Sequence, residues 1–449
     1  MNQTMSYKLN QQTRPKYDLF VFGDSLSDIG NLFEKTAGLV PSSSRYFEGR
    51  FSNGPLAVEI LAEALGLPSS RSTNFAIGGA RTDRTNVGDI GPIQFGGLLD
   101  EIDQFTAQAK DLGAGAEDLY LVWEGGNDFL NLLSDPANPT VVVNAAVTNT
   151  VTAVKTLIAT GAKNIVVAQT PNLGRTPKSL EAGELQALTA VSNAYNVALA
   201  TALNQVEQSS QTGTNIILTD LFTPSENIAQ NPSAFGFSNV TEAFLESETA
   251  SDPSQFFFWD EVHPTTRGHS ILADVFRNTI ISNITDDITR VGTAKNDRLV
   301  SFSGNDRLNG RGGEDYLEGN AGKDILVGGA ANDILMGGNN RDELMGGIGK
   351  DFLQGGAGRD RFIYSSGKEG RDTIADFQTG KDLIDLRAIF SKRNFDRPNS
   401  FEAYVRLSQT SQGTVVKVDS NGDLAGGFTA LAVLSEVNVG DINRSSFRV

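Results

Sequence analysis

The stretch Asp324-Ile-Leu-Val-Gly-Gly-Ala-Ala-Asn-Asp333-Ile-Leu-Met-Gly-Gly-Asn-Asn-Arg-Asp342 repeats itself every nine residues. Seventeen of the 47 glycines of the chain lie between residues 292 and 363, where Gly-Gly pairs recur in the same phase. Because the period is fixed, this segment is a structural repeat rather than a flexible glycine-rich linker. Eight aspartates hold the phase, and a large apolar residue follows each by two positions: Asp297, Asp306, Asp315, Asp324, Asp333, Asp342, Asp351 and Asp360.

The repeating unit is Gly-Gly-x-Gly-x-Asp-x-Leu-x. Glycine tolerates positive φ angles, so the first six residues are predicted to form a tight turn that presents carbonyl oxygens and one carboxylate. The last three residues are predicted to form a short strand whose leucine points into a narrow core. Two units would complete one coil, which stacks aspartates 18 residues apart on the same side. Calcium suits such a stack because it accepts about six to eight oxygen ligands in flexible geometry.

Some units depart from this pattern, which leaves the calcium sites at their turns open, above all at the N-terminal edge of the repeat. The substituted positions are Thr293, Lys295, Ser301, Phe302, Ala331 and Asn340.

These units resemble the repeats-in-toxin, or hemolysin-type, calcium-binding family, and residues 372–386 resemble the segment that follows such repeats. The resemblance implies a parallel β-roll over residues 291–363 and secretion through a type I exporter with an uncleaved C-terminal signal. Residues 364–449 are then a β-rich cap, with strands expected at 414–418 and 430–434 and a hairpin turn at Asn421-Gly422. The implied calcium ligands are Asp306, Asp315, Asp324, Asp333, Asp342, Asp351 and Asp360.

Upstream of the repeat, short apolar runs alternate with helical patterns. The runs span 17–23, 119–123, 164–168 and 215–219, and the helical patterns span 55–65, 141–160, 185–207 and 266–282. Each run has the length of a buried parallel strand, so the alternation predicts a doubly wound α/β domain. We expect this domain to occupy residues 16–288, after an N-terminal tail of residues 1–15.

Composition excludes several classes of protein. The chain has no cysteine, which rules out disulfides and thiolate chemistry, and its formal net charge is −17, which argues against a nucleic-acid partner. We expect no transmembrane helix, because no apolar run reaches about 18 residues. The first residues lack the apolar core of a cleavable secretory signal, a feature that agrees with export through a C-terminal signal.

Four short segments carry candidate chemistry. Ser25 lies in Gly23-Asp24-Ser25-Leu26, directly after the first apolar run, where active sites of parallel sheets lie. Gly78-Gly79 could bring a backbone N–H close to a substrate, and Asn127 follows a second strand and could donate to a developing oxyanion. Asp260-Glu-Val-His263-Pro supplies a histidine near neutral pKa with a carboxylate three residues before it.

Each segment also has an ordinary structural interpretation: a helix N-cap for Ser25, a plain turn for the glycines, a capping turn for Asn127 and a surface position for the histidine. His269 is the only other histidine of the chain. The four segments occur together in this order, and that joint pattern resembles the GDSL, or SGNH, hydrolase superfamily over residues 15–285. Residues 49–55 resemble a stretch of its lipase-acylhydrolase branch.

The resemblance implies a three-layer, flavodoxin-like α/β/α domain that cleaves carboxylic esters without a catalytic cofactor. It makes Ser25 the nucleophile, His263 the general base and Asp260 the residue that orients His263. The oxyanion hole would combine the Ser25 N–H, the Asn127 side chain and the Gly79 N–H, with Gly78 as the alternative donor. Both ester hydrolysis and transfer of the acyl group to an alcohol are compatible with this resemblance. A catalytically inactive calcium-binding surface or adhesion protein is the competing hypothesis.

Overall fold

The computed structural model describes residues 17–134, 137–210, 213–391, 400–419 and 427–449. The expected tail at 1–15 and the expected turn at Asn421-Gly422 lie outside these residues. The described chain folds into two compact units, and the boundary between them falls between Ile284 and Thr285. Each unit is described by itself.

The first unit contains a parallel sheet in the order β1-β2-β3-β4, formed by Leu19–Gly23, Leu119–Trp123, Asn164–Ala168 and Asn215–Thr219. An extended segment runs along the free edge of β1: Val21 N–H donates to the Thr73 carbonyl (3.0 Å) and Phe75 N–H donates to the Val21 carbonyl (2.8 Å). The segment at residues 73–75, which comes after β1 and before β2 in the chain, therefore lies on the outer side of β1. This is the strand order of a flavodoxin-like, doubly wound sheet, which confirms the predicted fold class.

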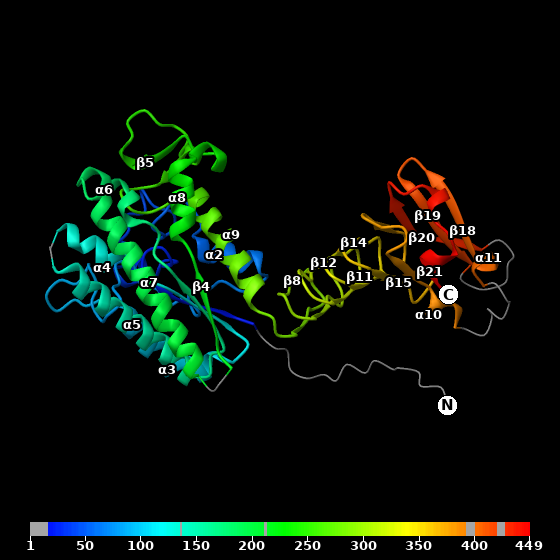
Figure 1. Cartoon of the computed structure of the whole chain (residues 1–449), viewed down its shortest axis with the longest axis horizontal. Helices are drawn as coiled ribbons and strands as arrows, with labels where there is room; N and C mark the ends of the chain where they lie inside the picture. Colours follow the sequence, from blue (N-terminus) through cyan, green and yellow to red (C-terminus); the bar gives the residue numbers. More distant parts are fainter. Residues whose placement is uncertain (1–16, 135–136, 211–212, 392–399, 420–426) are drawn as a thin grey trace. The chain divides into compact units, whose positions relative to one another are not determined.

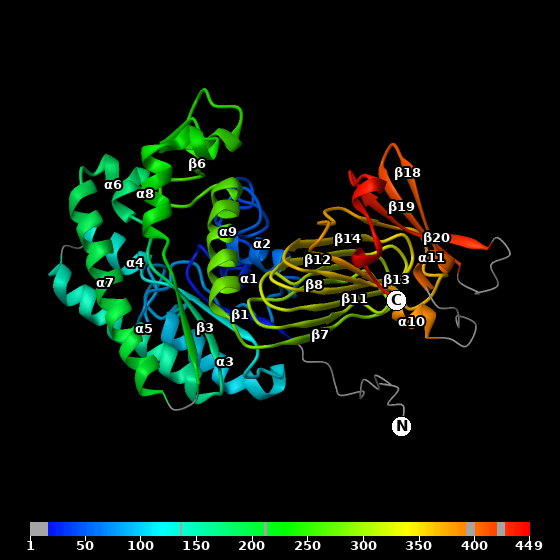
Figure 2. The ribbon, with the colours of Figure 1, turned by 45° about the vertical axis from the view of Figure 1, so that its right-hand side comes forward.

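Helices cover both faces of this sheet (Figures 1 and 2). One layer contains α3 (Leu98–Leu112), α5 (Pro139–Ala159) and α7 (Leu185–Ser209), and the other contains α2 (Ala57–Ala64) and α9 (Thr266–Asn283). Alternate side chains of each strand face opposite layers. The rings of Phe20 and Phe105 pack 5.2 Å apart on the first face, and those of Trp123 and Phe276 pack 5.2 Å apart on the second.

Among the described helices, α5 is the one long and apolar enough to cross a membrane by length and composition alone. Its buried residues pack in the core that α7 and the sheet also form, and include Ala146, Ala153, Val154 and Leu157. This packing buries 33% of the most apolar window of the helix.

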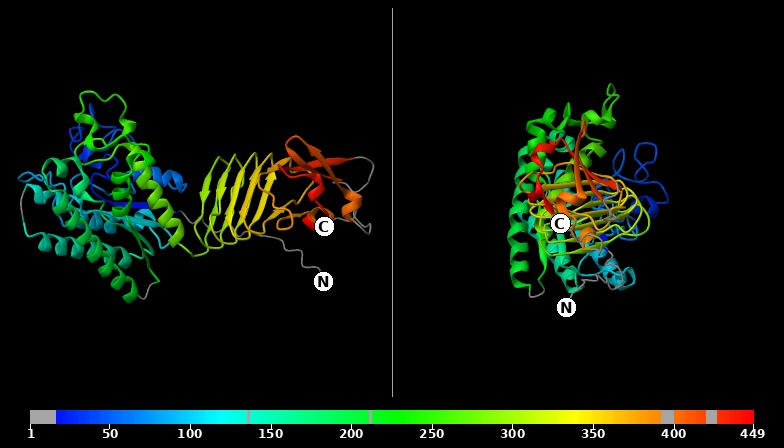
Figure 3. Two further views of the ribbon diagram at one scale, coloured as in Figure 1. Left: turned by 45° about the horizontal axis from the view of Figure 1, so that its top comes forward. Right: turned by 90° about the vertical axis from the view of Figure 1, so that its right-hand side faces the viewer.

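The second unit begins as a two-sheeted β-roll (Figure 3). The longest strands within the repeats are β11 (Ile325–Ala330), β12 (Ile334–Asn339), β13 (Glu343–Ile348) and β14 (Phe352–Ala357). Alternate units pair in parallel, so Leu326 lies opposite Leu344 and Leu335 opposite Leu353. All four of these leucines are at most 1% exposed, which confirms the predicted inward column. The prediction of three-residue strands was wrong for these four, because they continue through the Gly-Gly pair.

The β-rich end of the chain extends both sheets of the roll. Strands β16 (Asp372–Ile374) and β17 (Leu383–Asp385) continue the parallel stacks, and β21 (Phe447–Arg448) follows β17. β16 also pairs in parallel with β20 (Phe428–Ser435). β20 pairs antiparallel with β19 (Gly413–Asp419), and β19 pairs antiparallel with β18 (Val405–Thr410). The strands expected at 414–418 and 430–434 lie within β19 and β20.

Candidate functional site

Ser25 stands at the carboxyl end of β1, in a turn that leaves its hydroxyl at the sheet edge. Gly23 ends the strand with φ at 149°, and a Cβ at this position would overlap the Trp123 carbonyl. The Asp24 carbonyl then accepts the N–H groups of Ser27 and Asp28, each at 3.0 Å. Ser25 is 8% exposed, so most of the residue is buried in this turn.

The structure brings Ser25, His263 and Asp260 into one hydrogen-bonded chain, although 235 residues separate the serine from the carboxylate in sequence. Nε2 of His263 lies 2.7 Å from Ser25 Oγ. Nδ1 of the same ring lies 2.7 Å from Oδ2 and 2.9 Å from Oδ1 of Asp260. The backbone N–H groups of Val262 and His263 also donate to Asp260 Oδ1, which orients the carboxylate.

The interaction between His263 and Asp260 shifts the pKa of each group in the direction opposite to the effect of burial. Burial alone would lower the pKa of His263, but the charge of Asp260 and its hydrogen bond to the ring raise that pKa above 6.5. Burial alone would raise the pKa of Asp260, but His263 and the two backbone donors hold it well below its usual range. The imidazole is therefore a strengthened base beside an ionised carboxylate.

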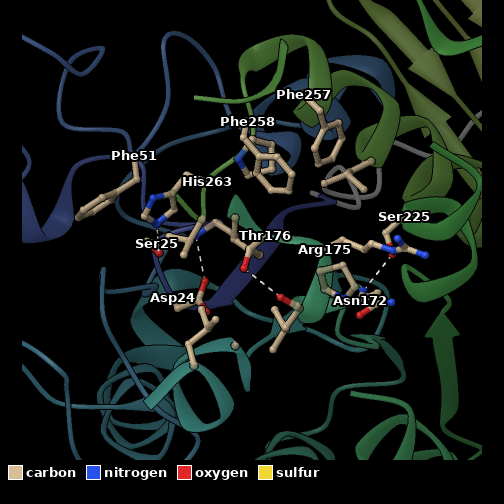
Figure 4. Close-up of a pocket in the computed structure, with 18 of the residues that line it drawn as sticks. Asp24, Ser25, Phe51, Asn172, Arg175, Thr176, Ser225, Phe257, Phe258 and His263 are labelled. Atoms are coloured by element: carbon tan, nitrogen blue, oxygen red, sulfur yellow. Dashed lines mark hydrogen bonds between the residues drawn. The ribbon is translucent and has the colours of Figure 1, made fainter. Parts of the chain in front are cut away.

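Two aromatic residues contact Asp260 and His263, and sequence reasoning assigned a role to neither. The Tyr46 hydroxyl donates to Asp260 Oδ2 at 2.7 Å. The Phe51 ring lies beside the His263 ring (Figure 4), with 5.1 Å between their centroids. It also fills the space where a Cβ of Gly78 would stand. Only the tertiary structure brings these residues, more than 200 positions upstream, to the histidine.

Gly79 and Asn127 line the same cavity as Ser25. The Gly78 N–H is engaged, because it donates to Asp28 Oδ2 at 2.8 Å. Within the described chain, the N–H groups of Ser25 and Gly79 have no such acceptor. The Asn127 amide donates to the Ala80 carbonyl at 2.8 Å and makes only a long contact, 3.4 Å, with Asp24 Oδ2. Of the two glycines, Gly79 is thus the one with a free N–H at the site.

Several buried carboxyl groups lie close to Ser25 and its neighbouring turns. Glu101 accepts the N–H groups of Gly23 (2.8 Å) and Ile77 (3.2 Å), which ties the strand end to the glycine turn, and burial raises its pKa well above the usual range. Burial raises the pKa of Asp24 to about 6 and that of Asp128 to about 6. Sequence reasoning did not find Glu101, since nothing in its helix marks it as different from other helical glutamates.

An apolar cavity of about 280 Å³ opens next to Ser25 (Figure 4). Three polar residues line one part of it: the Asn172 N–H donates to Ser225 Oγ at 2.9 Å, and Arg175 pairs with Glu226 nearby. The remaining wall is mostly hydrophobic, with contributions from Trp123, Leu130, Leu173, Ile228, Val240, Phe257, Phe258 and Leu272. A cavity of this kind accommodates an apolar group attached to a carbonyl held at Ser25.

His269 does not take part in this arrangement. It lies on α9, fully buried, and neither ring nitrogen has a hydrogen-bond partner in the described chain. Burial lowers its pKa to about 3, so the ring stays neutral. Of the two histidines, the structure places His263 at Ser25.

The repeat turns form a second set of sites, built from aspartates and glycine carbonyls. If Gly337 had a Cβ, that atom would lie 2.7 Å from Asp342 Oδ2 and 2.7 Å from the Gly355 carbonyl oxygen. Gly319 faces Asp324 and Gly337 in the same way, at 2.5 Å each. The glycine therefore leaves open a cradle of oxygens that belong to successive coils. Calcium fits this donor set, since it prefers carboxylate and carbonyl ligands.

One carboxylate oxygen of most turns has no partner within the described chain. In each, Oδ1 accepts a backbone N–H from the aspartate one coil earlier, as from Asp324 to Asp342 at 2.9 Å. The buried Oδ2 atoms without a partner belong to Asp315, Asp324, Asp333, Asp342, Asp351, Asp360 and Asp372. Burial and neighbouring carboxylates raise the pKa of Asp324 to about 8 and that of Asp333 to about 7, as expected of acids that lack a counterion.

The edges of this stack differ from its middle turns. Oδ2 of Asp306 accepts the Phe302 N–H at 3.3 Å, and Oδ2 of Asp297 accepts the Thr293 hydroxyl at 2.9 Å, so neither is an unpartnered acceptor. At the other end, Asp372 and Asp382 continue the ladder, bonded to the N–H groups of Asp351 and Asp360. Their spacings of 21 and 22 residues break the nine-residue period, which is why the periodicity did not reveal them.

Two of the substituted turns, those of Ala331 and Asn340, keep the backbone form of the glycine-containing turns. Ala331 has φ at 87° and Asn340 has φ at 75°, the left-handed conformation that glycine adopts more easily. The Ala331 carbonyl still packs against Gly349, as the Asn340 carbonyl does against Gly358. These two replacements therefore preserve the carbonyl positions of the turn.

Comparison with known proteins identifies both units. Residues 19–276 match the model of the GDSL-like lipase/acylhydrolase family, and four overlapping matches between residues 291 and 374 are to the RTX calcium-binding nonapeptide repeat. The phosphatidylcholine-sterol acyltransferase of Aeromonas hydrophila is 30% identical over 315 residues, which cover 58% of this chain and 90% of that protein.

Two further relatives match a similar share of the chain. The secreted effector protein SseJ of Salmonella typhimurium is 28% identical, and the thermolabile hemolysin of Vibrio parahaemolyticus is 29% identical. The matched regions cover 58% and 56% of this chain, and only 63% and 61% of those proteins. The chain belongs to the GDSL-like lipase/acylhydrolase family, as an esterase/lipase whose catalytic domain is followed by RTX calcium-binding repeats.

Proposed function

We propose that the protein hydrolyses carboxylic esters through an acyl-enzyme on Ser25, with His263 as general base and Asp260 as its orienting carboxylate. The observation that carries this proposal is the continuous chain from Ser25 Oγ through His263 to Asp260, with links of 2.7 Å on both sides of the imidazole. An apolar cavity adjoins the same hydroxyl, so an acyl chain and its carbonyl have a place at the nucleophile.

In the acylation step, Oγ of Ser25 attacks the ester carbonyl carbon while its proton passes to Nε2 of His263. The charge of Asp260 stabilises the imidazolium that forms. The C–O bond of the ester then breaks, the proton moves from His263 to the departing alcohol, and the acyl group stays on Ser25. In deacylation, His263 accepts a proton from water as the water attacks the acyl carbon. The bond between that carbon and Ser25 Oγ then breaks, the proton passes from His263 to Oγ, and the acid leaves.

The tetrahedral intermediates carry a negative oxygen that needs donors. We assign this role to the N–H groups of Ser25 and Gly79 and to the Asn127 side chain. The 3.4 Å contact between Asn127 and Asp24 is the weaker of the two that the amide makes, so its hydrogen is the one available to the oxyanion. Donors already in place stabilise the developing charge without reorganisation.

The relatives' names suggest two kinds of acceptor for the acyl group. One relative is called a phosphatidylcholine-sterol acyltransferase, and the family name includes both lipases and acylhydrolases. The apolar lining of the cavity supports a fatty acyl or other hydrophobic acyl group. We propose hydrolysis as the main reaction, with transfer to an alcohol as a variant that competes when water is scarce at the acyl-enzyme.

The repeats have a separate role in this proposal. Calcium bound by the aspartates and glycine carbonyls of successive turns neutralises the stacked carboxylates and so stabilises the roll. A roll that folds only with calcium stays unfolded at low cytosolic calcium, a condition that favours export through a type I exporter and folding outside the cell. The relative named as a secreted effector supports an extracellular destination. No calcium is assigned to catalysis, which we place within residues 16–288.

Ester hydrolysis can be tested with a panel of p-nitrophenyl esters, from acetyl to long acyl chains, and with phospholipids. Wild-type protein should release the acid from at least part of the panel, and Ser25→Ala and His263→Ala should both lose turnover. Added methanol or a sterol distinguishes transfer from hydrolysis, because transfer yields a new ester. A wild-type protein that cleaves no member of the panel would support the inactive-scaffold hypothesis instead.

A further inference from the structure

Exposed large hydrophobic residues of the catalytic unit are concentrated in two loops. Eight such residues lie on the described surface of residues 17–284, and six of them belong to the loops at 36–51 and 82–97. The exposed fractions reach 76% for Leu39 and 74% for Ile90, values unusual for such large aliphatic side chains. The six are Leu39, Val40, Phe47, Val87, Ile90 and Ile93. We call these two loops the apolar rim.

Both loops of the apolar rim reach the active site through adjacent glycines. Phe51, at the end of the first loop, packs on Gly78, and Val87, in the second loop, lies 2.8 Å from the Cβ position of Gly79. Phe51 and Val87 also line the cavity beside Ser25. Val87 is at the same time 52% exposed, so the apolar lining of the cavity continues out to the surface of the rim.

Hydrogen bonds hold the second loop in a form that keeps its isoleucines outside. The backbones of Ile90 and Ile93 bond to each other in both directions, at 3.0 and 3.1 Å, which closes a tight turn at the tip. Asp89 accepts the N–H groups of Asn86 (2.9 Å) and Phe95 (2.8 Å) and so braces the base of that turn. The loop therefore presents two large aliphatic side chains at its outer end.

The charge of the apolar rim differs from that of the domain around it. Residues 17–284 contain 13 basic and 30 acidic residues, a net charge of −17. The two loops contain three basic and three acidic residues, so the rim is neutral in an otherwise acidic domain. Such a surface fits an apolar partner without net charge, whereas an anionic surface would be repelled by the rest of the domain.

We propose that the apolar rim docks the catalytic unit on an uncharged or zwitterionic lipid surface, from which an ester enters the cavity beside Ser25. The inference rests on the proposed ester hydrolysis for its substrate, since a water-soluble ester would need no such surface. Large contiguous apolar patches on a soluble domain mark interaction sites, and aliphatic side chains at loop tips gain from transfer into the acyl region of a lipid layer. The continuity through Val87 gives the acyl chain an apolar path.

The first loop also connects the rim to the catalytic residues. Tyr46 bonds to Asp260, and its neighbour Phe47 is one of the exposed rim residues. Contact of the rim with lipid would therefore restrain the segment that carries Tyr46. We expect the advantage of wild-type protein over a rim variant to be confined to substrates presented in a lipid layer.

The test uses the full chain with calcium and phosphatidylcholine vesicles. Leu39→Ser/Ile90→Ser/Ile93→Ser removes apolar side chains that lie outside the cavity, and Val141→Ser/Val197→Ser is the matched control, because those valines are 63% and 61% exposed on α5 and α7. For binding, both are made in a Ser25→Ala background, so that no lipid is cleaved. Flotation should show at least a roughly tenfold loss of partitioning for the rim variant and less than about twofold for the control.

Activity with a soluble ester, p-nitrophenyl acetate, separates this proposal from the catalytic one. The rim variant with Ser25 intact should keep wild-type turnover of the soluble ester and lose most turnover of phosphatidylcholine vesicles. The docking proposal would be overturned by equal vesicle binding of wild type and rim variant, by no vesicle binding at all, by tighter binding to phosphatidylglycerol, or by a rim that instead drives self-association in gel filtration. Failure of wild type on the soluble ester would count against the catalytic proposal alone.

Discussion

The Tyr46 hydroxyl donates a 2.7 Å hydrogen bond to Oδ2 of Asp260, the same oxygen that lies 2.7 Å from Nδ1 of His263. The carboxylate is thus held from two sides, by a tyrosine from the loop at 36–51 and by the backbone of its own turn. This arrangement gives Asp260 one orientation toward the imidazole.

Tyr46→Phe should therefore lower kcat by about three- to tenfold while KM changes little, because one hydrogen bond contributes roughly 0.5–1.5 kcal/mol. The remaining carboxylate is less stabilised and attracts the imidazolium more strongly, so the acidic limb of the pH–rate profile should move slightly upward. Tyr120→Phe is the control, since that hydroxyl donates to the Gly115 carbonyl at 2.8 Å, away from Asp260. Identical kinetics for both variants would show that Tyr46 has no positioning role.

The pH dependence follows from the raised pKa of His263. The imidazole must be neutral to accept the serine proton, so kcat/KM should fall as the pH drops through the raised pKa of His263. Asp260→Asn removes the charge that raises this pKa, and burial then lowers it. The acidic limb should shift to lower pH while kcat falls by roughly 10⁴-fold, the loss seen when a catalytic histidine loses its carboxylate. An unchanged limb would mean that another group titrates.

The role of Asn127 can be measured by truncation. Asn127→Ala removes one donor to the oxyanion, and we expect kcat to fall by about 100- to 1,000-fold with a smaller change in KM. Asn149→Ala is a suitable control, because the Asn149 amide donates to the Thr82 hydroxyl at 3.3 Å and the residue does not line the cavity beside Ser25. A change below about threefold for Asn127→Ala would assign it to the bond with Ala80 alone.

Much of the fold could be predicted from the sequence, because buried parallel strands and stacked repeats have strong local signatures. The strands β2, β3 and β4 begin and end where the apolar runs do, and the leucine column of the roll follows the nine-residue period. Helix α3 was missed: its first turn follows Gly96-Gly97, and its polar residues obscure a stripe of Leu98, Ile102 and Phe105.

The site could be predicted only in part. Ser25 and His263 stand in short motifs of their own, but Tyr46, Phe51 and Glu101 are recognisable only through contacts made across the fold. The choice between Gly78 and Gly79 likewise needed the structure, since it depends on the bond from Gly78 to Asp28. The nine-residue period did not reveal that Asp372 and Asp382 continue the aspartate ladder, because the spacing lengthens to 21 and 22 residues where the roll meets the cap.

Two glycine substitutions test the calcium cradle. Gly337→Ala places a methyl group 2.7 Å from both Asp342 Oδ2 and the Gly355 carbonyl, whereas Gly312→Ala meets nothing closer than 3.9 Å. Neither glycine has a positive φ, so backbone strain is not a difference between them. Gly337→Ala should raise the calcium concentration needed to fold residues 291–449, measured by circular dichroism, by about tenfold or more, and Gly312→Ala should not. Equal calcium dependence would contradict the cradle.

The central claim is that Ser25 is the nucleophile and that His263 activates it. A fluorophosphonate probe, followed by mass spectrometry of the labelled peptide, tests this claim most directly, because the probe reacts with activated serines. We predict a single adduct on Ser25 in wild-type protein and none in Ser25→Ala, strongly slowed labelling in His263→Ala, and near wild-type labelling in His269→Ala. An adduct on another serine, or wild-type labelling of Ser25 without His263, would contradict the account.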